Sequence, residues 1–566
     1  MSRTSLSALL AVIASALVHA PVGEAQVWEV GNVLLELATP QAHAYYGLAM
    51  AAGDFDGDGV TDLAVGAPYW NSSSTSDAGR VRVYAGNVTR GFSTIGILAG
   101  SGASDSELGE ALAAGDFDGN GHDELAIGLP AFDAGGTIDS GAVAIADYDG
   151  SSWSTWMFSQ DDTPWSPPEP GDRFGETLEV GDFNGDGYDD LAVGSPYENF
   201  FTGVETGCVQ IYYGSGSGLS TTDSQGFAAG MNGVLGVGTT TDHMGWSLAA
   251  GDFDGDGYDD LAIGAPHRDV LGLDDAGQVH ILYGSSTGIV TDGQQLLSDD
   301  LGGIVLAAHD YFGAALASYN FNEAPWYCVL YPCYEDLAIG IPGQQLAGHQ
   351  NVGCVKVTYG GPDGIQTIGF DYLDANSANA APEEGDRFGQ KLAAGHSTAP
   401  ASTTHGDLAV ATPYEDYYLT NDGFVHLFFG SNLGVDMDHQ EQPLGQYPGF
   451  EVAPPEANDY FGTTMVFGDF DGDGHGDLAI GVPYKDSGAL DDSGCVQVLY
   501  GALFAGGFEC GGTSNWTVTR PGRDGNPRRH GACPPASEES LPVDQPGGAG
   551  TEEPESRRSG LRRVGG

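Results

Sequence analysis

Short apolar segments recur along the chain at a nearly constant spacing, and polar, glycine-rich stretches separate them. The clearest segments have the form Leu-Ala-(Val/Ile)-Gly-x-Pro or a close variant, and they begin at Leu63, Leu125, Leu191, Leu261, Leu337, Leu408 and Leu478. After a polar loop, each is followed by a second segment in which branched apolar residues alternate with other residues. Such alternation between turn residues is typical of β-strands rather than helices.

The spacing of these segments defines a long internal repeat. Positions 54, 116, 182, 252, 320, 396 and 469 mark the same point in each repeat, so successive repeats lie 62 to 76 residues apart. That length accommodates four short strands with their loops, and a polypeptide of seven such units predicts a propeller, whose usual size is about four to eight blades. The predicted fold class is therefore all-β, a seven-bladed β-propeller of four-stranded blades.

The two ends of the repeat region indicate how the ring closes. Little sequence after Gly501 could supply the last strand of repeat seven, whereas residues 33–37, ahead of repeat one, form an unassigned apolar segment. We predict that this N-terminal strand completes the last blade and removes an exposed sheet edge. The predicted domains are a signal peptide at 1–25, the propeller at 26–501 and a low-complexity, largely disordered tail at 502–566.

Five repeats carry an acidic turn directly before the Leu-Ala segment. In the clearest copy, carboxylates occupy positions 1, 3, 5 and 9 of a nine-residue turn that begins at Asp252. Hard oxygen ligands in this number suit Ca²⁺. An EF-hand loop would place its last ligand at position twelve, which here is the apolar Ile263, so we predict a calcium turn between two strands.

About five Ca²⁺ sites are predicted from these turns. The side chains at positions 1, 3, 5 and 9 and the backbone carbonyl at position 7 are the expected ligands; the side chains of His122 and His475, both at position 7, are expected to face solvent. The predicted ligand residues are Asp54, Asp56, Asp58, Val60, Asp62; Asp116, Asp118, Asn120, His122, Glu124; Asp182, Asn184, Asp186, Tyr188, Asp190; Asp252, Asp254, Asp256, Tyr258, Asp260; and Asp469, Asp471, Asp473, His475, Asp477.

Repeats five and six keep the frame without the acidic turn. The turn of repeat five, residues 320–335, carries Cys328 and Cys333, and a disulfide between them could hold the hairpin that an ion holds elsewhere. The turn of repeat six, residues 396–406, is small and polar and is expected to bind no metal. The remaining cysteines are Cys208, Cys354 and Cys495, which are expected to be buried and unbonded, and Cys510 and Cys533, whose pairing the sequence leaves open.

The charge distribution limits the classes of partner. The chain has 566 residues and a formal net charge of −61; residues 502–566 hold eight basic and eight acidic residues, which leaves 10 basic and 71 acidic residues in 1–501. Five bound Ca²⁺ would offset only ten of these charges. A body this acidic disfavours nucleic acids and anionic membrane surfaces as partners.

The N-terminus resembles an export signal. Arg3 precedes an apolar stretch at 6–20, and small residues near Gly23 offer a cleavage site. The stretch is short for a membrane span, and no later segment reaches about 18 uninterrupted apolar residues. The expected location is therefore secreted, extracellular or on the cell surface, with an uncleaved anchor as the alternative.

The recurring order of aromatic-Gly pair, acidic turn and Gly-x-Pro resembles the FG-GAP repeat. Representative residues are Phe174-Gly175 and Gly264-Ala265-Pro266. This repeat forms the seven-bladed propeller at the head of integrin alpha chains, and the resemblance covers about 45–501. It implies Ca²⁺ on one face of the propeller, partners on the opposite face, and adhesion or ligand recognition. Integrin stalk domains and an inserted adhesion domain are missing from this sequence, which looks more like the free-standing FG-GAP proteins of bacterial secretomes.

A secreted, calcium-stabilised binding propeller is the leading functional interpretation, with a protein or glycan ligand on one face. The segments at 70–78, 199–205 and 414–422 are candidates for that face by position. The chain is predicted not to be an enzyme, since it has no H-E-x-x-H, nucleophile-elbow or phosphate-loop motif. The alternatives are a propeller-based hydrolase, for which His243, His267 and His280 could meet near repeat four, and a structural cell-surface or matrix protein.

Overall fold

The computed structural model describes residues 26–27 and 32–501, with internal gaps of which the longest are 323–332 and 446–454, and a pair of two-residue strands, β30 (Arg520–Pro521) and β31 (Pro527–Arg528). The chain divides into two units, residues 1–508 and 509–566. The first unit contains the blades described below. Residues 1–25 and most of the predicted tail lie outside the described residues.

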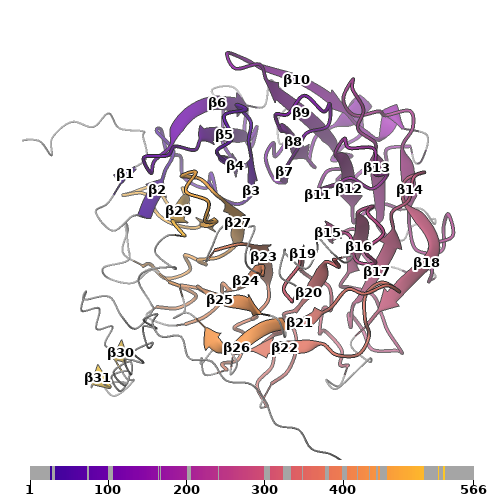
Figure 1. Ribbon diagram of the computed structural model, residues 1–566. Coiled ribbons are helices and arrows are strands. Elements are labelled where there is room, and N and C mark those ends of the chain that lie inside the picture. The colour runs from indigo at the N-terminus through magenta and orange to yellow at the C-terminus, as the bar shows by residue number, and fades with distance from the viewer. Residues whose placement is uncertain are drawn as a thin grey trace, which may run out of the picture. The chain divides into compact units, whose positions relative to one another are not determined.

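Seven antiparallel sheets make up the described part of the first unit (Figure 1). Within each sheet the strands follow chain order from the innermost outward. Blades one to three are β3 (Met50–Gly53), β4 (Asp62–Ala67), β5 (Arg80–Ala85), β6 (Ser93–Ala99); β7 (Leu112–Gly115), β8 (Glu124–Leu129), β9 (Ala142–Tyr148), β10 (Trp153–Phe158); and β11 (Thr177–Gly181), β12 (Asp190–Ser195), β13 (Cys208–Tyr212), β14 (Gln225–Phe227).

Blades four to seven repeat this order. Their strands are β15 (Ser247–Gly251), β16 (Asp260–Ala265), β17 (Gln278–Tyr283), β18 (Val290–Leu297); β19 (Leu316–Tyr319), β20 (Asp336–Ile341), β21 (Cys354–Thr358), β22 (Asp371–Asp374); β23 (Lys391–Gly395), β24 (Asp407–Thr412), β25 (Phe424–Ser431), β26 (Gly434–Gln440); and β27 (Thr464–Gly468), β28 (Asp477–Val482), β29 (Cys495–Leu499), β2 (Asn32–Leu35), β1 (Gln26–Val27). In the last blade, β2 from the N-terminus is the fourth strand and the two-residue β1 extends the sheet to five strands.

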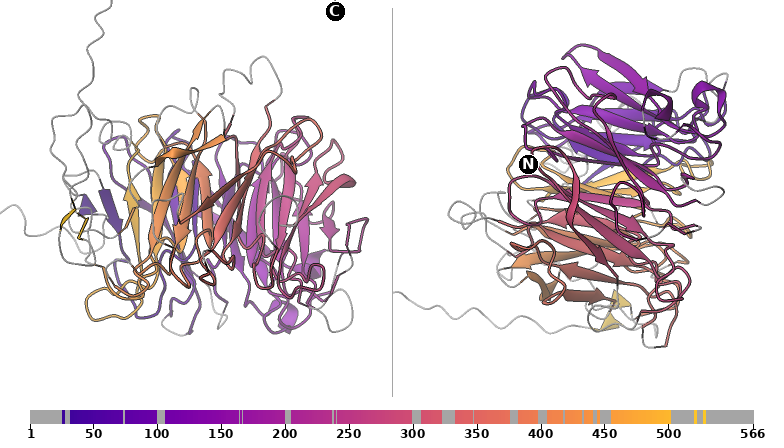
Figure 2. Two further views of the ribbon diagram at one scale, coloured as in Figure 1. Left: turned by 90° about the horizontal axis from the view of Figure 1, so that it is seen from below. Right: turned by 90° about the vertical axis from the view of Figure 1, so that its right-hand side faces the viewer.

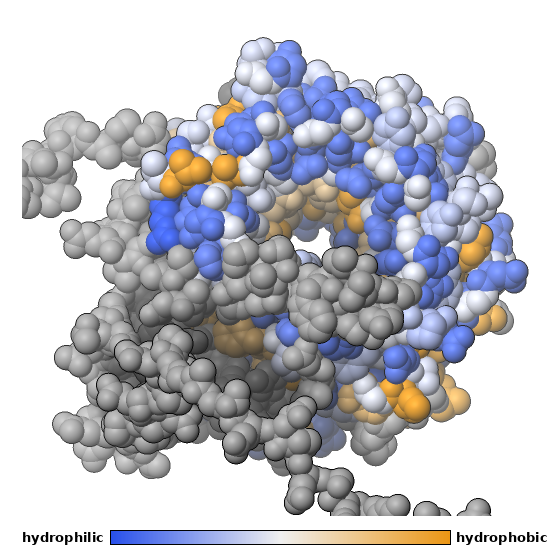
Figure 3. Space-filling view, viewed as in Figure 1, coloured by the Kyte–Doolittle hydropathy of each residue, from blue (hydrophilic) through white to orange (hydrophobic). Residues whose placement is uncertain are grey.

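The blades close into a ring. Each innermost strand contacts the innermost strand of the next blade, and β27 of blade seven contacts β3 of blade one. Figure 2 shows the blades from the side, and Figure 3 shows an opening near the centre of the ring with polar residues over much of the described surface around it. The predicted seven-bladed, four-stranded all-β propeller is confirmed. The helical segments among the described residues are two short 3₁₀ turns, η1 (Ala134–Gly136) and η2 (Gln160–Asp162).

The predicted closing strand is also confirmed. Strand β2 pairs antiparallel with β29, so that Val33 lies opposite Val498 and Leu35 opposite Val496. Val33 and Leu35 are 0% and 1% exposed. The first and last parts of the propeller sequence therefore share one sheet.

The apolar core is divided among the blade interfaces. Seven clusters of buried residues occur, each combining side chains from two neighbouring blades; one, for example, unites Phe55 and Val81 of blade one with Leu125 and Ile127 of blade two. A single blade has no core of its own, so each blade is stabilised by its two neighbours, as in other repeat folds.

The third strand of six blades places a polar residue in this core at one common register. The residue lies opposite an apolar residue of the second strand, as His280 does opposite Ile263. All six are at most 6% exposed: Arg82, Gln210, His280, Lys356, His426 and Gln497. Burial lowers the pKa of both His280 and His426 to about 4.

We expect these two histidines to make the propeller acid-sensitive. A histidine whose pKa is depressed by folding stabilises the protein fully above its unfolded pKa, and that contribution is lost as the pH falls from about 6.5 toward 4. At pH 5 the loss is about 2 kcal/mol for each histidine. His280→Gln, which introduces the residue found at this register in blades three and seven, should therefore lose about 2 kcal/mol less than the parent between pH 7.5 and 5 in urea unfolding.

The exposed loop residue His349 provides the control for this experiment. His349→Gln should show the same pH dependence as the parent protein. An identical pH dependence for His280→Gln and the parent would contradict the prediction.

Candidate functional site

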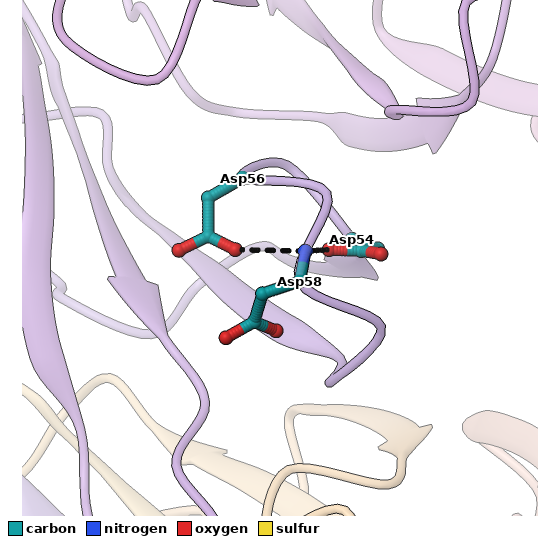
Figure 4. A group of neighbouring side chains, drawn as sticks. All are labelled: Asp54, Asp56 and Asp58. Atoms are coloured by element: carbon teal, nitrogen blue, oxygen red, sulfur yellow. Dashed lines mark hydrogen bonds between the residues drawn. The ribbon is translucent and has the colours of Figure 1, made fainter.

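The acidic turns connect the first and second strands of blades one, two, three, four and seven, at the end of the blades that we call the acidic face. In the first turn, Gly57 and Gly59 have φ values of 71° and 84°, which reverse the chain within a few residues. Between these two glycines, the backbone N–H of Asp58 donates to Asp54 Oδ1 and Asp56 Oδ1 at 3.1 and 3.3 Å (Figure 4). The N–H of Gly59 donates to Asp54 Oδ2 at 2.9 Å.

The same hydrogen bonds recur in the other four turns. The N–H at position 5 donates to the side chain at position 1, and the N–H at position 6 donates to its second oxygen, in the turns that begin at Asp116, Asp182, Asp252 and Asp469. The position-1 carboxylate is thus fixed by the backbone of its own turn. The backbone curls around this carboxylate and leaves the other acidic side chains of the turn on the same side.

Carboxylate oxygens converge in four of the five turns. Three acidic residues in each offer oxygens that all lie within 4.8 Å of one another: Asp54, Asp56 and Asp58; Asp116, Asp118 and Glu124; Asp252, Asp254 and Asp260; and Asp469, Asp471 and Asp477. The turn at Asp182 has an asparagine at position 3 and the same backbone hydrogen bonds. Hard oxygen donors in this arrangement fit a Ca²⁺ ion.

Position 9 has a structural function in addition to its place in the acidic cluster. Asp260 Oδ2 accepts from Phe253 N at 2.9 Å and Oδ1 accepts from Gly284 N at 2.8 Å, so the residue joins the turn to the end of the third strand. Blades five and six, without an acidic turn, keep Asp336 and Asp407 with the equivalent bonds to Gly360 and Gly430. The sequence analysis assigned position 9 only as a metal ligand. The signal for its second function was that blade five, which has no acidic turn, still has an aspartate at this position, Asp336.

Burial makes the position-9 carboxylates difficult to ionise. Burial and, to a smaller extent, the neighbouring carboxylates of the same turn raise the pKa of Asp62 to about 7 and that of Asp260 and Asp477 to about 8. A buried carboxylate surrounded by like charges is stabilised by an added positive charge. The electrostatics of these turns therefore favour cation binding.

Position 8, which the sequence analysis did not single out, connects neighbouring turns. Asp123 of blade two accepts from Asp54 N of blade one at 2.8 Å, and its own N–H donates to Asp54 O at 3.1 Å. Asp189 and Asp259 make the same pair of bonds to the turns at Asp116 and Asp182. Position 1 of these three turns is consequently held from the next blade as well as from its own turn.

The side chain at position 7 packs against the preceding turn. A Cβ added to Gly57 would lie 2.4 Å from His122 Nε2, and one added to Gly119 would lie 2.5 Å from the Tyr188 ring. The His122 ring covers Gly57 and is half-buried, so it is only partly exposed to solvent. His475 instead places Nδ1 2.9 Å from Asp473 Oδ1. That the backbone carbonyls at position 7 bind the metal ion stays a prediction.

Cysteines and the two variant turns are only partly described. Cys208, Cys354 and Cys495 are buried, as expected. Cys328 lies outside the described residues, as do Cys510, Cys533 and much of the turns of blades five and six, so the Cys328–Cys333 disulfide and the absence of metal in those turns stay predictions.

The opposite end of the blades, which we call the aromatic face, carries a circle of side chains at two recurrent positions. One position precedes each aromatic-Gly pair or its counterparts Leu108-Gly109 and Met244-Gly245, and the other follows each Gly-x-Pro or its counterpart Ala411-Thr412-Pro413. We name this circle the collar; its members are Tyr45, Glu107, Arg173, His243, Tyr311, Arg387, Tyr460 and Tyr69, Ala131, Tyr197, His267, Gly343, Tyr414, Tyr484.

Rings of the collar contact one another across the blade boundaries. In one run, Tyr414, Tyr460, Tyr484, Tyr45 and Tyr69 follow one another with ring centroids 5.0–5.4 Å apart. A second run links Tyr197, His243, His267 and Tyr311 with centroids 4.9–5.3 Å apart. All nine rings are half-buried, so each keeps part of its surface available.

The collar position before each aromatic-Gly pair has an unusual backbone. All seven residues there are non-glycine, and their φ values lie between 50° and 57°. A bulky residue in this region costs of the order of 1–3 kcal/mol and is enriched at functional sites. Each residue is held by its N–H, which donates to a loop of the preceding blade, as Tyr45 N does to Asp492 O at 3.2 Å.

The histidines near repeat four meet only in part. His243 and His267 contact each other in the collar with ring centroids 4.9 Å apart, whereas His280 lies in the core as described above. The three predicted loops, 70–78, 199–205 and 414–422, are each only partly described, because residues 73–74, 200–204 and 417–418 lie outside the described residues. The sequence analysis missed the collar. The feature that could have revealed it was the aromatic residue that follows Gly-x-Pro, or its counterpart in repeat six, in five repeats.

Comparison with known proteins agrees with this geometry. A family model described as FG-GAP repeat matches residues 46–84, 108–146, 174–212, 244–282 and 461–499, which are the five blades with acidic turns. Five FG-GAP repeats therefore lie in this seven-bladed propeller, and the chain is similar in sequence to integrin alpha chains. The match and the confirmed ring support the sequence-based interpretation of the fold.

Curated relatives fall into two groups. Integrin alpha-PS2 of Drosophila melanogaster is 33% identical over 41% of this chain and 16% of its own length. Phosphatidylinositol-glycan-specific phospholipase D is 33% identical over 28% of this FG-GAP chain in Rattus norvegicus, and 24% identical over 74% of it in Bos taurus, covering 19% and 48% of those proteins. The FG-GAP chain thus spans less than half the length of these relatives. Among its described residues, no helix has the length and apolar character of a membrane span.

Proposed function

We propose that this chain is a secreted or cell-surface propeller that Ca²⁺ stabilises at its acidic face and that binds a protein or glycan ligand at its aromatic face. The observation that carries the proposal is the division of chemistry between the two ends of the blades. Carboxylates converge in turns at one end, and strained aromatic residues form a collar at the other. The two ends therefore suit different tasks, ion binding and contact.

Calcium at the acidic turns would act structurally. The cation would be held by positions 1, 3, 5 and 9 and would supply positive charge to carboxylates that burial and mutual repulsion destabilise. Because position 8 of the next blade holds position 1 in the turns of blades one, two and three, an ordered turn also supports its neighbour. These links would stabilise blades one to four together.

The collar has the composition of a recognition surface. Tyrosine, tryptophan and arginine are enriched in binding sites, because they provide large contact areas with polar ends. Trp246 lies 5.3 Å from His267 by ring centroid and so adjoins the collar, and Arg387 lies over the Tyr414 ring at 5.0 Å. The name integrin among the relatives also favours a protein ligand.

A test of ligand binding can separate the two faces. The full chain would be applied to an array of glycans and to immobilised extracellular proteins in millimolar Ca²⁺. Tyr45→Ala/Tyr460→Ala, in the collar, should reduce any binding at least tenfold, while Tyr258→Ala, on the acidic face, should preserve it. Equal loss in both variants, or binding unaffected by the collar substitutions, would contradict the assignment of the aromatic face.

Catalysis is not part of the proposal, although some relatives are named phospholipases. The match covers at most 48% of their length, so their activity does not transfer with the repeats. We expect no turnover of a phosphatidylinositol-glycan substrate by the purified chain. Hydrolysis above a buffer control, and lost on substitution of His243 or His267, would instead favour a hydrolase.

The acidic face yields a prediction that separates metal binding from hairpin support. Asp254→Ala, at position 3, should lower stability by about 1.4 kcal/mol in Ca²⁺ at ten times Kd and have little effect in EDTA. Asp260→Ala, at position 9, should cost about 2 kcal/mol in EDTA, since it leaves two backbone N–H groups without their acceptor. The measurement is urea unfolding under both conditions.

Blade five supplies the control for these variants. Asp336 makes the same two backbone bonds without an acidic turn, so Asp336→Ala should cost equally much with and without Ca²⁺. A calcium-dependent cost for Asp336→Ala, or a large cost of Asp254→Ala in EDTA, would contradict the separation of the two tasks.

A further inference from the structure

A group of buried polar side chains lies inside blade three, away from the acidic turns. Asp172 precedes β11, Glu198 follows β12, and Gln160 lies in η2 at the boundary with blade two; their exposed fractions are 0%, 0% and 1%. Gln160 Nε2 donates a short hydrogen bond to Glu198 Oε2, and Glu169 N donates to Asp172 Oδ2 at 2.6 Å. Two carboxylates and a carboxamide are thus enclosed together.

The unpartnered atoms of these side chains are oxygens. Asp172 Oδ1 and Gln160 Oε1 are buried without a hydrogen-bond partner. A buried polar atom without a partner costs about 1–3 kcal/mol and indicates a group that completes the site. A half-turn of the Gln160 amide would place Oε1 where Nε2 now meets Glu198. The site would then present oxygens from three side chains.

In two other blades, a cationic side chain lies beside the aspartate that is equivalent to Asp172. In blade four, Arg268 forms an ion pair with Asp242, and in blade seven Lys485 Nζ lies 3.1 Å from Asp459 Oδ2. Asp172, Asp242 and Asp459 share one position, two residues before the aromatic-Gly pair. Glu198, Arg268 and Lys485 share another, two residues after the proline of Gly-x-Pro. Blade three, like blade six with Asp386 and Glu415, has a carboxylate where blades four and seven have a cation.

We propose that Asp172, Glu198 and Gln160 form a binding site for one divalent cation inside blade three, in addition to the acidic turns. The cation takes the place of the guanidinium or ammonium group of blades four and seven. Two carboxylates and one divalent ion are neutral together, and hard oxygen donors are the ligands of Ca²⁺ and Mg²⁺. One shared proton would satisfy a single oxygen, whereas a cation contacts all three side chains. Consistent with the need for positive charge, burial and then Glu198 raise the pKa of Asp172 to about 8.

Anomalous scattering from crystals soaked in Tb³⁺, a probe for calcium sites, tests the proposal directly. A difference peak is expected between Asp172 and Glu198, separate from any peaks in the acidic turns. Because the locations differ, the outcome for blade three is independent of whether the turns bind the ion. Peaks in the turns with no peak at Asp172 would overturn the proposal and assign the pair a shared proton.

Two substitutions extend the test to solution. Glu198→Arg recreates the ion pair of blade four and should reduce the Ca²⁺ stoichiometry measured by calorimetry by one equivalent. It should also raise the melting temperature in EDTA. If Glu198→Arg does not fold, Glu198→Gln is the smaller change to use, and it should abolish the same equivalent of bound Ca²⁺. Asp254→Asn, in an acidic turn, is the control and should keep the blade-three Tb³⁺ peak. Unchanged stoichiometry in the folded Glu198 variant would contradict the proposal.

Discussion

Deleting residues 26–40 is expected to destabilise the propeller by about 6 kcal/mol or to prevent its folding, because the deletion removes three buried side chains and reopens the ring. Val33, Leu35 and Leu37 are 0%, 1% and 5% exposed. Full burial of an aliphatic side chain contributes about 1.5–3 kcal/mol. The deletion also leaves β29 as an unpaired edge, which favours aggregation. Thermal unfolding of the deleted and parent chains measures the effect.

Point variants of the same strand supply matched controls. Leu35→Ala, inside the sheet, should cost about 2–5 kcal/mol, whereas Glu36→Ala, on its exposed side, should have little effect. A synthetic peptide of residues 26–40 added to the deleted chain should restore part of the lost stability. If the deleted chain and the parent protein had the same melting temperature, β2 would contribute little to ring closure.

Removing calcium is the second change with a large expected effect. At ten times Kd, each site stabilises the folded state by about 1.4 kcal/mol, so five independent sites contribute about 7 kcal/mol. A folded unit of this size unfolds with an entropy of about 1 kcal/mol per degree, which converts that contribution into a melting temperature about 7 °C lower in EDTA. Differential scanning calorimetry with Ca²⁺ and with EDTA provides the measurement.

Two further experiments test whether bound Ca²⁺ causes this change in melting temperature: adding the ion back and substituting residues of single turns. Excess Ca²⁺ added after EDTA should return the melting temperature to its starting value. Asp254→Ala should reduce the EDTA-induced shift by about one fifth, since it disables one of five equivalent sites, whereas Asp336→Ala should leave the shift unchanged. A melting temperature indifferent to EDTA would remove the basis for calcium-stabilised blades.

Much of this protein could be predicted from the sequence because its repeats are local. The strand pattern, the turn between Gly53 and Asp62 and the frame around each Gly-x-Pro lie within a few residues of one another, so periodicity and spacing reveal them. The repeat number then implied a closed ring, and the missing strand of repeat seven pointed to residues 33–37. These predictions needed no knowledge of which side chains meet across blades.

The remaining features depend on contacts between blades, which spacing does not encode. Asp123 reaches the turn of the preceding blade, His122 covers Gly57, and the rings of Tyr45 and Tyr484 meet across the closure. In blade three, only the fold brings Gln160, Asp172 and Glu198 into one buried place. The sequence by itself determined the blade, since each blade is a local hairpin array. The tertiary structure decided what lies between blades, since every core cluster and several ring contacts of the collar are shared by two neighbouring blades.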